Sequence, residues 1–394
     1  CMCVFIYLIL YFSAPLIARA FHNDMRLIPL SRVMFLSFIL NGLGIVQTNR
    51  LMKMMQVKQI ALANIAGLTL SGIAGVWLAL AGYGPWALVW QTIVLAAIKT
   101  SWLWLTGGWL PRYGMSASSL RSVYRVGASV FATSLLNTIF LNVYNFVIGI
   151  WYSFASLGDY TQADKWSKMG SASLSQILTS TFVPLLSRFQ DDRERYREMM
   201  GKVNRLTAFM LFPFMGGLVV MAEPLFHTLF GTKWDSAIPL FQLLAARGIF
   251  TVLCSLYGNY LLSLGYARSL VVIEVVKDCA IIAAIGATVF LHSVEALVWG
   301  QLAAGVLTWL FVLWLTSRAT GFPAGSLFGG LVPYLLLTLA CMALCHMLGL
   351  VVPYAPLLLA MQCVVGLGVY LAILRLCGDS ILREALGFLL KKTK

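Results

Sequence analysis

Three charged residues stand close together in one stretch of the chain. The segment GDYTQADKWSKMGSASLSQ (158–176) carries Asp164 and Lys168 four residues apart, which places them on one face of a helix, and Lys165 follows Asp164 directly. A lysine ammonium is a compact point charge, so the two lysines could together bind an anionic group. The alternative is an Asp164–Lys168 pair that is neutralised locally at a water boundary.

The same segment is polar along much of its length. Asp159 and Tyr160 lie near its start, where we expect the outer mouth of the helix. Its polar, small-residue face then continues through Ser171, Ser173, Ser175 and Gln176. Such a face is consistent with lining a hydrated cleft or with close packing against a neighbouring helix.

A second charged cluster lies in VIEVVKDCA (272–280). Glu274 and Asp278 are four residues apart, with Lys277 beside them. The helical rise places them roughly 7–14 Å inside an apolar segment. Carboxylates at that depth could bind a proton or another cation, or they could form a structural pair with the lysine. Arg247, in LLAARGIF, is interpreted either as a partner for a carboxylate inside a helix bundle or as a cation that faces a cleft.

Amide and hydroxyl side chains gather in SLLNTIFLNVYNFVIGI (134–150), which carries Asn137, Asn142, Tyr144 and Asn145. Asn137 and Asn145 are about two helical turns apart and therefore share a face. They could hydrogen-bond the hydroxyl groups of a polar ligand. They could equally bond a neighbouring helix, a contact worth about 0.6–2 kcal/mol in a membrane.

The elements that carry these residues must be membrane helices. Of the 394 residues, 60% are hydrophobic and 11% are charged, and the mean hydropathy is +0.86. A soluble protein of this size could not bury so much apolar surface, and the alternating pattern of a barrel strand is absent. We predict an all-α polytopic membrane protein with about 12 transmembrane helices, at 2–20, 29–47, 59–82, 85–106, 126–150, 158–186, 206–222, 238–264, 269–291, 294–316, 327–349 and 354–376.

The net charge of +14 is distributed unevenly between the two sides of these spans. Of 28 Lys and Arg residues, 19 fall in alternate connections and the C-terminal tail, four fall on the opposite side (Arg19, Arg26, Arg32 and Lys233), and five fall within spans. This is the positive-inside distribution, which predicts that the basic loops and the C-terminus are cytoplasmic. It also accounts for the positive charge without nucleic-acid binding.

The eight cysteines lie mostly in apolar spans, where a free thiol behaves as a small hydrophobe. Their spacing does not suggest a disulfide framework. Cys341, Cys345 and His346 could share a helix face, but the surrounding span is apolar and offers no acidic ligand. We therefore expect neither a metal nor another cofactor.

A repeated pattern relates two parts of the chain. The tetrapeptide ALVW occurs at 87–90 and again at 296–299, an offset of 209. Other matches fall at 209 or 210: Pro15 with Pro224, Asn49 with Asn259, Lys58 with Arg268, and WLT at 104–106 with WLT at 314–316. Several colinear matches near one offset indicate an internal repeat.

Six predicted spans separate equivalent points of the repeat, so both copies have the same orientation in the membrane. This predicts two lobes with a cleft between them and access that alternates as the lobes rock. We expect residues 1–110 to form the first lobe with four helices and residues 111–320 to form the second with six. Residues 321–394 would add two helices and an amphipathic cytoplasmic tail.

The repeat also predicts a first lobe of six helices. Its start would lie about 84 residues upstream of Cys1, so we expect the sequence to be an N-terminally truncated part of a 6 + 6 + 2 architecture. The alternative is a complete twelve-helix protein that begins at Met2.

Four segments resemble one known family: LGDYTQADKWSKM (157–169), FVPLLSRFQDD (182–192), FPFMGGLVVMAEPLFHTLFGTKWDSAIPLFQLLA (212–245) and LNGLGIVQTNRLMKM (40–54). They are similar to the bacterial Wzx-type oligosaccharide flippases, which are polysaccharide biosynthesis proteins of the multidrug/oligosaccharidyl-lipid/polysaccharide exporter superfamily. The resemblance extends over essentially the whole chain. It implies a 14-helix protein with two six-helix lobes, of which the first two helices are absent here.

The resemblance implies a transporter, not an enzyme. Such a protein flips an undecaprenyl-pyrophosphate-linked oligosaccharide from the cytoplasmic to the outer leaflet of the bacterial inner membrane, for lipopolysaccharide, capsule or exopolysaccharide assembly. Lys165 and Lys168 would bind the pyrophosphate, and the asparagines would bind sugar hydroxyls. Glu274, Lys277 and Asp278 would couple a proton or Na⁺ gradient to lobe movement. Membrane lipids and the polysaccharide assembly machinery are the further partners it implies.

Two other classes of function compete with this one. A drug/cation antiporter of the same superfamily would have twelve helices and a less cationic cleft. A membrane polysaccharide polymerase or glycosyltransferase would need a sizeable loop outside the membrane with clustered acidic, His or Arg residues, and the connections here are short. A non-transporting scaffold is a further alternative.

Overall fold

The computed structural model describes residues 2–108, 117–190, 192–352 and 354–383. Within these ranges the chain forms α-helices and two short 3-10 helices and contains no strand, which confirms the all-α prediction. Ten helical segments there are long and apolar enough to cross a membrane. The predicted spans 158–186 and 269–291 also form helices but are not among the ten, because the first is rich in charged and hydroxyl side chains and the second carries Glu274, Lys277 and Asp278 close together. The count of twelve is therefore not confirmed.

The chain divides into two compact units, Cys1–Thr138 and Ile139–Lys394. The helices of the first unit are α1 (Met2–Ala20), α2 (Leu27–Met34), α3 (Leu36–Lys53), α4 (Val57–Leu80), α5 (Pro85–Gly107) and the start of α6 (Ala117–Trp151), which continues into the second. The second unit adds α7 (Phe154–Ser187), α8 (Arg193–Val220), α9 (Ala222–Phe230), η1 (Thr232–Trp234), α10 (Ala237–Ser263), α11 (Ala267–Thr288), η2 (Val289–Leu291), α12 (Val294–Thr320), α13 (Ala324–Gly329), α14 (Val332–Val351) and α15 (Ala355–Leu376).

Small residues let the helices of the first unit pack closely. In this unit α5 packs against both α3 and α4. The buried face of α4 carries Ala63, Gly67, Ser71 and Gly75, one small residue every four positions. A Cβ on Gly67 would lie 3.1 Å from the side chain of Leu95 on α5. This small-residue spacing is a common way for membrane helices to approach one another.

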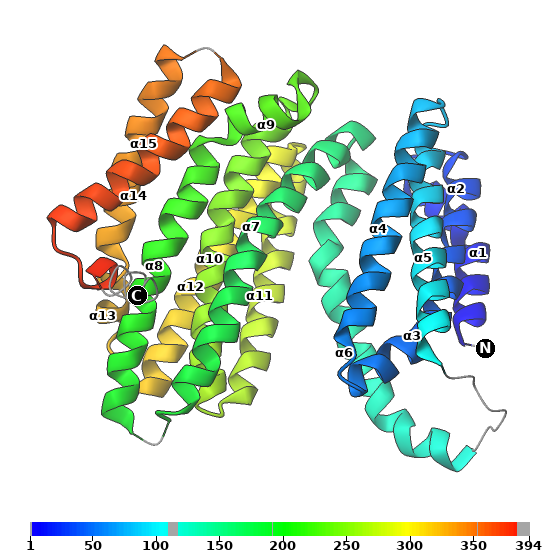
Figure 1. Ribbon diagram of the computed structural model, residues 1–394, viewed down its shortest axis with the longest axis horizontal. Coiled ribbons are helices and arrows are strands. Elements are labelled where there is room, and N and C mark those ends of the chain that lie inside the picture. The colour runs from blue at the N-terminus through cyan, green and yellow to red at the C-terminus, as the bar shows by residue number, and fades with distance from the viewer. Residues whose placement is uncertain (1, 109–116, 191, 353, 384–394) are drawn as a thin grey trace. The chain divides into compact units, whose positions relative to one another are not determined.

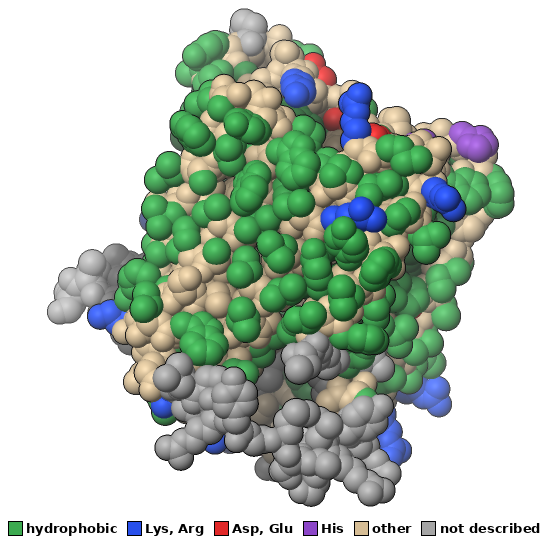
Figure 2. Space-filling model, turned by 90° about the vertical axis from the view of Figure 1, so that its right-hand side faces the viewer, with side chains coloured by type: hydrophobic (Ala, Val, Ile, Leu, Met, Phe, Trp, Pro, Cys, Tyr) green, Lys and Arg blue, Asp and Glu red, His purple; other side chains and the backbone are tan. Residues whose placement is uncertain are grey.

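Helix α10 is the centre of the second unit, where it contacts α7, α8, α11 and α12 (Figure 1). Its buried residues include Tyr257 and Tyr260, which belong to a core cluster shared with α8 and α12. Many hydrophobic side chains outside such clusters are exposed. On the face shown in Figure 2, hydrophobic side chains form a broad field with Lys and Arg mostly toward its upper and lower ends, as expected of a surface in contact with lipid.

The repeat predicted from the sequence recurs in the backbone. Met55, with φ of 57°, joins α3 to α4, and Gly265, with φ of 81°, joins α10 to α11 exactly 210 positions later. The next residue closes each helix end in the same way: Gln56 N donates to Leu51 O at 2.9 Å, and Tyr266 N donates to Leu261 O at 2.9 Å. Gly82 and His292, also 210 apart, both have positive φ at the following turn.

Several helices begin or end differently from the prediction: α6 begins at Ala117 rather than at 126, and the predicted span 327–349 is divided between α13 and α14. The span predicted at 206–222 is part of α8, which begins at Arg193 and is continuous with the surface helix predicted at 187–205. Asp192 caps it by accepting from the backbone N–H groups of Glu194 and Arg195, each at 3.2 Å. The predicted span at 29–47 is interrupted at Phe35, between α2 and α3. Most of the predicted amphipathic tail (380–394) lies outside the described residues.

The matched turns predict opposite effects of two substitutions. A non-glycine residue with positive φ costs about 1–2 kcal/mol, so Met55→Gly should raise the free energy of unfolding and Gly265→Ala should lower it, each by about 1 kcal/mol. Thermal unfolding of the purified protein in detergent measures both. Gly286→Ala is the control, because this exposed α11 glycine has no atom within 4 Å of an added Cβ. A destabilising Met55→Gly would contradict the shared turn.

Candidate functional site

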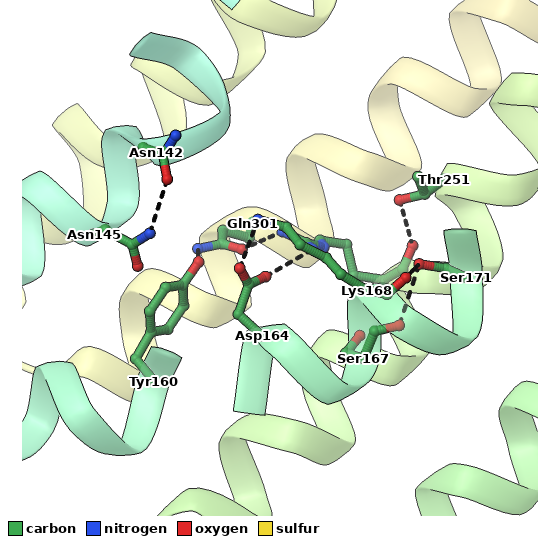
Figure 3. A network of polar contacts seen from close by, with 10 residues as sticks. Asn142, Asn145, Tyr160, Asp164, Ser167, Lys168, Ser171, Thr251 and Gln301 are labelled. Atoms are coloured by element: carbon green, nitrogen blue, oxygen red, sulfur yellow. Dashed lines mark hydrogen bonds and ion pairs between the residues drawn. The ribbon is translucent and has the colours of Figure 1, made fainter. Parts of the chain in front are cut away.

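Asp164 and Lys168 of α7 are joined to α10 and α12 by a continuous polar network (Figure 3). Lys168 Nζ lies 2.6 Å from Asp164 Oδ2, and Arg247 Nη2 lies 3.2 Å from Asp164 Oδ1. Arg247 Nη1 donates to Gln301 Oε1 at 2.6 Å, and Gln301 Nε2 donates to the Tyr160 hydroxyl at 2.9 Å. The network therefore links three helices of the second unit through five side chains.

Helical spacing and a glycine bring these side chains together. Tyr160, Asp164 and Lys168 follow one another at four-residue intervals, so they lie along one face of α7. On α10, Arg247 is followed by Gly248. A Cβ on Gly248 would lie 3.3 Å from Cβ of Ser171 on α7 and would overlap Met215. The missing side chain thus allows α10 to approach α7 beside the ion pair.

Asp164 is a buried carboxylate shared by two cations. Its side chain is 7% exposed, that of Arg247 is 20% exposed, and that of Lys168 is 43% exposed. A buried carboxylate is tolerated only when it is paired and hydrogen-bonded, and here each oxygen has its own cation. One negative and two positive charges leave a positive charge on the network. The exposed Lys165 adds another, so the group remains cationic even with Asp159 included.

A second face of α7 is both polar and exposed. It carries Thr161, Lys165, Ser173, Gln176 and Ser180, at spacings that keep them on one side of the helix. The three hydroxyl groups each donate to a backbone carbonyl of α7 itself. Within the described residues, Lys165 and Gln176 have no such partner. An exposed lysine and amide are costly against lipid, so this face suits a hydrated surface.

Two contacts that the sequence analysis considered are present in the structure. Asp164 and Lys168 do form the predicted pair. Arg247 is a partner for a carboxylate inside the bundle. Tyr160, which was expected at the outer mouth, has a side chain only 2% exposed, and its hydroxyl accepts from Gln301 Nε2.

The predicted group on α6 includes Asn142 and Asn145, which Figure 3 shows near this network. Asn145 Nδ2 donates to Asn142 Oδ1 at 3.3 Å, a bond within one helix, and the second Asn145 atom, Oδ1, is buried without a partner among the described residues. Tyr144 is buried, and its hydroxyl likewise has no partner there. Asn137 is exposed and belongs to the first unit. The contacts do not test the predicted role of these residues in binding sugar hydroxyls, which stays a prediction.

The α11 cluster is a separate group. Lys277 Nζ forms an ion pair with Glu274 Oε1, and the two side chains are 34% and 48% exposed. Asp278 Oδ1 is buried and has no hydrogen-bond partner among the described residues. Within those residues no hydrogen bond or ion pair connects this cluster to Asp164. The α14 thiols Cys341 and Cys345 are buried while His346 is exposed, so these three do not form one site.

Gln301 is a member of the network that sequence reasoning did not select. It lies two residues after the second ALVW, and Gln91 follows the first at an offset of 210. The offset of the repeat could therefore have identified Gln301 from the sequence. Asn259, a residue that the repeat did mark, donates from Nδ2 to Thr179 Oγ1 at 2.9 Å and so joins α10 to α7 at a second point.

The family model described as "Polysaccharide biosynthesis protein" matches residues 1–239 of the chain. The chain belongs to this family. Among its relatives is the succinoglycan biosynthesis transport protein ExoT of Rhizobium meliloti (strain 1021), 27% identical over 91% of this chain and 73% of ExoT. The teichuronic acid biosynthesis protein TuaB of Bacillus subtilis (strain 168) is 25% identical over 67% of this chain and 55% of TuaB.

The lipopolysaccharide biosynthesis protein WzxC of Escherichia coli (strain K12) is 25% identical over 61% of this chain and 49% of WzxC. The chain thus spans about half the length of two of these relatives and 73% of the third. The lipid II flippase MurJ, in an inward closed conformation, has the same fold. Its TM-score is 0.76 at 14% sequence identity, covering 94% of this chain and 80% of MurJ.

The shared carboxylate predicts a non-additive pair of substitutions. Asp164→Ala should lower the free energy of unfolding by about 3 kcal/mol, because it leaves the Arg247 guanidinium buried without a counter-charge. Adding Arg247→Met should restore part of that loss. Lys168→Ala should cost less than about 1 kcal/mol, since its side chain is partly exposed. Chemical unfolding in detergent measures all four proteins, and a double variant less stable than Asp164→Ala alone would contradict the shared-charge account.

Proposed function

We propose that this protein moves a lipid-linked oligosaccharide from the cytoplasmic to the outer leaflet of the bacterial inner membrane, by alternating access, for the assembly of a surface polysaccharide. The main support for this proposal is the exposed polar face of α7, which is cationic, in a chain that belongs to the polysaccharide biosynthesis family. The fold shared with MurJ, which is named as a lipid II flippase, supports the same reading. So does ExoT, a relative named as a biosynthesis transport protein.

The physical requirement of flipping is a polar path through a low-dielectric layer. Sugar hydroxyls and phosphates lose their hydration in lipid unless the protein supplies hydrogen bonds and counter-charges. On α7, Lys165 and Lys168 supply positive charge, and Gln176 supplies an amide further along the helix. Because the step breaks no covalent bond, it needs neither a nucleophile nor a general base. We therefore propose a transporter rather than an enzyme.

The substrate is proposed to be an oligosaccharide on undecaprenyl pyrophosphate. Lys165 and Lys168 would hold the pyrophosphate, and Asn137, Asn142 and Asn145 would bind sugar hydroxyls. The positive-inside distribution supports a cytoplasmic C-terminus. The polysaccharide assembly machinery would then receive the glycan at the outer leaflet.

The two α7 lysines give the direct test of this function. In proteoliposomes that contain the full-length protein, Lys165→Ala with Lys168→Ala should reduce outer-leaflet delivery of the lipid-linked oligosaccharide by at least about tenfold, because two charge-assisted contacts to the pyrophosphate are lost. Membrane insertion should be unchanged. Lys233→Ala is the matched control, since Lys233 is an exposed lysine of η1 that lies away from α7's charged residues in the sequence. Unchanged delivery by the double variant would remove the lysines from the substrate site.

The α11 carboxylates are proposed to couple transport to an ion gradient. Asp278 has a buried oxygen without a partner, which a proton or a Na⁺ ion could occupy. Glu274, one turn earlier, is held by Lys277.

If this is correct, collapse of the proton or Na⁺ gradient should slow flipping by the wild-type protein. Glu274→Gln with Asp278→Asn should then flip at a low rate that no longer responds to either gradient. Glu295→Gln, at the exposed first turn of α12, serves as the carboxylate control. Wild-type flipping that is indifferent to both gradients would exclude the coupling role.

A further inference from the structure

Arg32 is a cation held inside the apolar part of the first unit. It lies in the last turn of α2, within the membrane-crossing segment Leu27–Lys53. Its guanidinium carbon is 4.3 Å from the ring centroid of Tyr11, and its Nε donates to the Tyr11 carbonyl oxygen at 3.4 Å. Tyr11 is in the middle of α1, about 13 Å from either helix end. The sequence counted Arg32 among the outer-side charges, but these contacts fix its head group deeper in the span.

The bond to Tyr11 has a structural cause in α1. Pro15 lies inside this helix and has no backbone N–H, so the carbonyl four residues earlier has no helical donor. That carbonyl belongs to Tyr11. Arg32 Nε supplies the missing donor. One nitrogen of the guanidinium therefore donates to the carbonyl oxygen that Pro15 leaves without a helical donor.

The internal repeat places a neutral residue at the position that matches Arg32. Gln242 lies 210 positions after Arg32, and its Nε2 donates to the Val219 carbonyl at 3.1 Å. Val219 lies at the end of α8, five residues before Pro224, which is the repeat partner of Pro15. The carbonyl that Pro224 itself leaves without a helical donor is that of Val220, so the two bonds are similar but not equivalent. Gln242 nevertheless shows that a neutral amide at the matching position can donate to a backbone carbonyl near the proline.

Residues 1–138 offer little negative charge to balance Arg32. Residues 1–138 of the sequence include a single acidic residue, Asp24, against ten Lys and Arg. Asp24 lies in the turn between α1 and α2, where its Oδ1 accepts from the backbone N–H of Arg26 at 2.9 Å. An intramembrane arginine without a carboxylate partner is energetically costly. An anion from outside the unit would offset this cost.

We propose that Arg32 forms an oxyanion site in the first unit, which binds a phosphate group. Tyr11 holds the guanidinium by its ring and by its carbonyl, so the two terminal nitrogens, Nη1 and Nη2, are oriented as a fork that can bind two phosphate oxygens. The phosphate comes from the translocated lipid pyrophosphate, an assignment that rests on the proposed function. A phospholipid head group would supply the same chemistry, so the test separates the two.

Binding to the full-length protein in phosphatidylcholine nanodiscs tests the site, with undecaprenyl pyrophosphate and phosphatidylglycerol as the two probes. Arg32→Gln should weaken binding of undecaprenyl pyrophosphate about tenfold, because a charge-assisted contact is lost. Its melting temperature should stay at the wild-type value, since glutamine can keep the bond to Tyr11 as Gln242 does to Val219. Arg32→Lys should lose less affinity. Arg19→Gln, an exposed arginine at the end of α1, should bind like wild type.

The outcomes separate this site from the proposed function. Equal affinities of wild type and Arg32→Gln for both probes overturn the site. A lower melting temperature of Arg32→Gln with unchanged affinity assigns the charge a structural role and also overturns it. A loss confined to phosphatidylglycerol overturns the assignment to the translocated lipid. If wild type does not bind undecaprenyl pyrophosphate, the proposed function fails, and the phosphatidylglycerol comparison alone decides whether Arg32 binds phosphate.

Discussion

The carboxylate of Asp164 sets the arrangement of the second unit, because a negative charge inside a membrane protein must be matched wherever it lies. Its two oxygens take cations from two directions, Lys168 on the same helix and Arg247 on α10. Arg247 in turn holds Gln301 on α12. Three helices are thus held in register by one buried charge and the groups that satisfy it. Contacts between leucine side chains would fix the register of these helices less strongly, because a leucine is about as stable against lipid as against another helix.

The surplus of positive charge follows from the same arrangement. Two cations on one carboxylate leave the network positive, and Lys165 adds its charge on the exposed side of α7. Structural pairing and ligand binding are therefore not alternatives at this site. Asp164 fixes the position of Lys168, and the excess charge is what an anionic substrate would meet. The buried partners, Arg247 and Tyr160, support the exposed ones.

The internal repeat separates what the architecture needs from what each unit adds to it. The turns at Met55 and Gly265 have the same geometry, so the helix order of both units follows one plan. The charges inside the spans do not repeat, whereas Lys58 and Arg268 at the membrane boundary do. Ser37 and Gln91 stand at the positions equivalent to Arg247 and Gln301, and the Arg32 position is matched by the neutral Gln242. Residues at which two copies of one fold differ in charge are good candidates for function, because the other copy shows that the fold itself can form without them.

Much of the fold could be predicted from the sequence because lipid imposes simple rules. Long apolar segments must be helices, and their positions were predicted to within a few residues for α4, α5 and α15. The offset of 210 between Lys58 and Arg268 marked the repeat, and the same offset recurs in the adjoining turns. The ends of α8 and the break at Phe35 were not predicted, because helix caps and breaks depend on a few atoms and hardly change the mean hydropathy of a segment.

The sequence by itself determined the solvent and the helical class and placed Asp164 and Lys168 within reach of each other, because each of these depends on composition or on spacing within one helix. Only the tertiary structure decided the rest. Arg247 shares the carboxylate of Asp164, and Gln301 connects Arg247 to Tyr160. Arg32 donates to the Tyr11 carbonyl, which Pro15 leaves without a helical donor. These contacts join helices that are far apart in the chain. Their partners are selected by distance and by the need to satisfy buried polar atoms, and neither is expressed in local sequence.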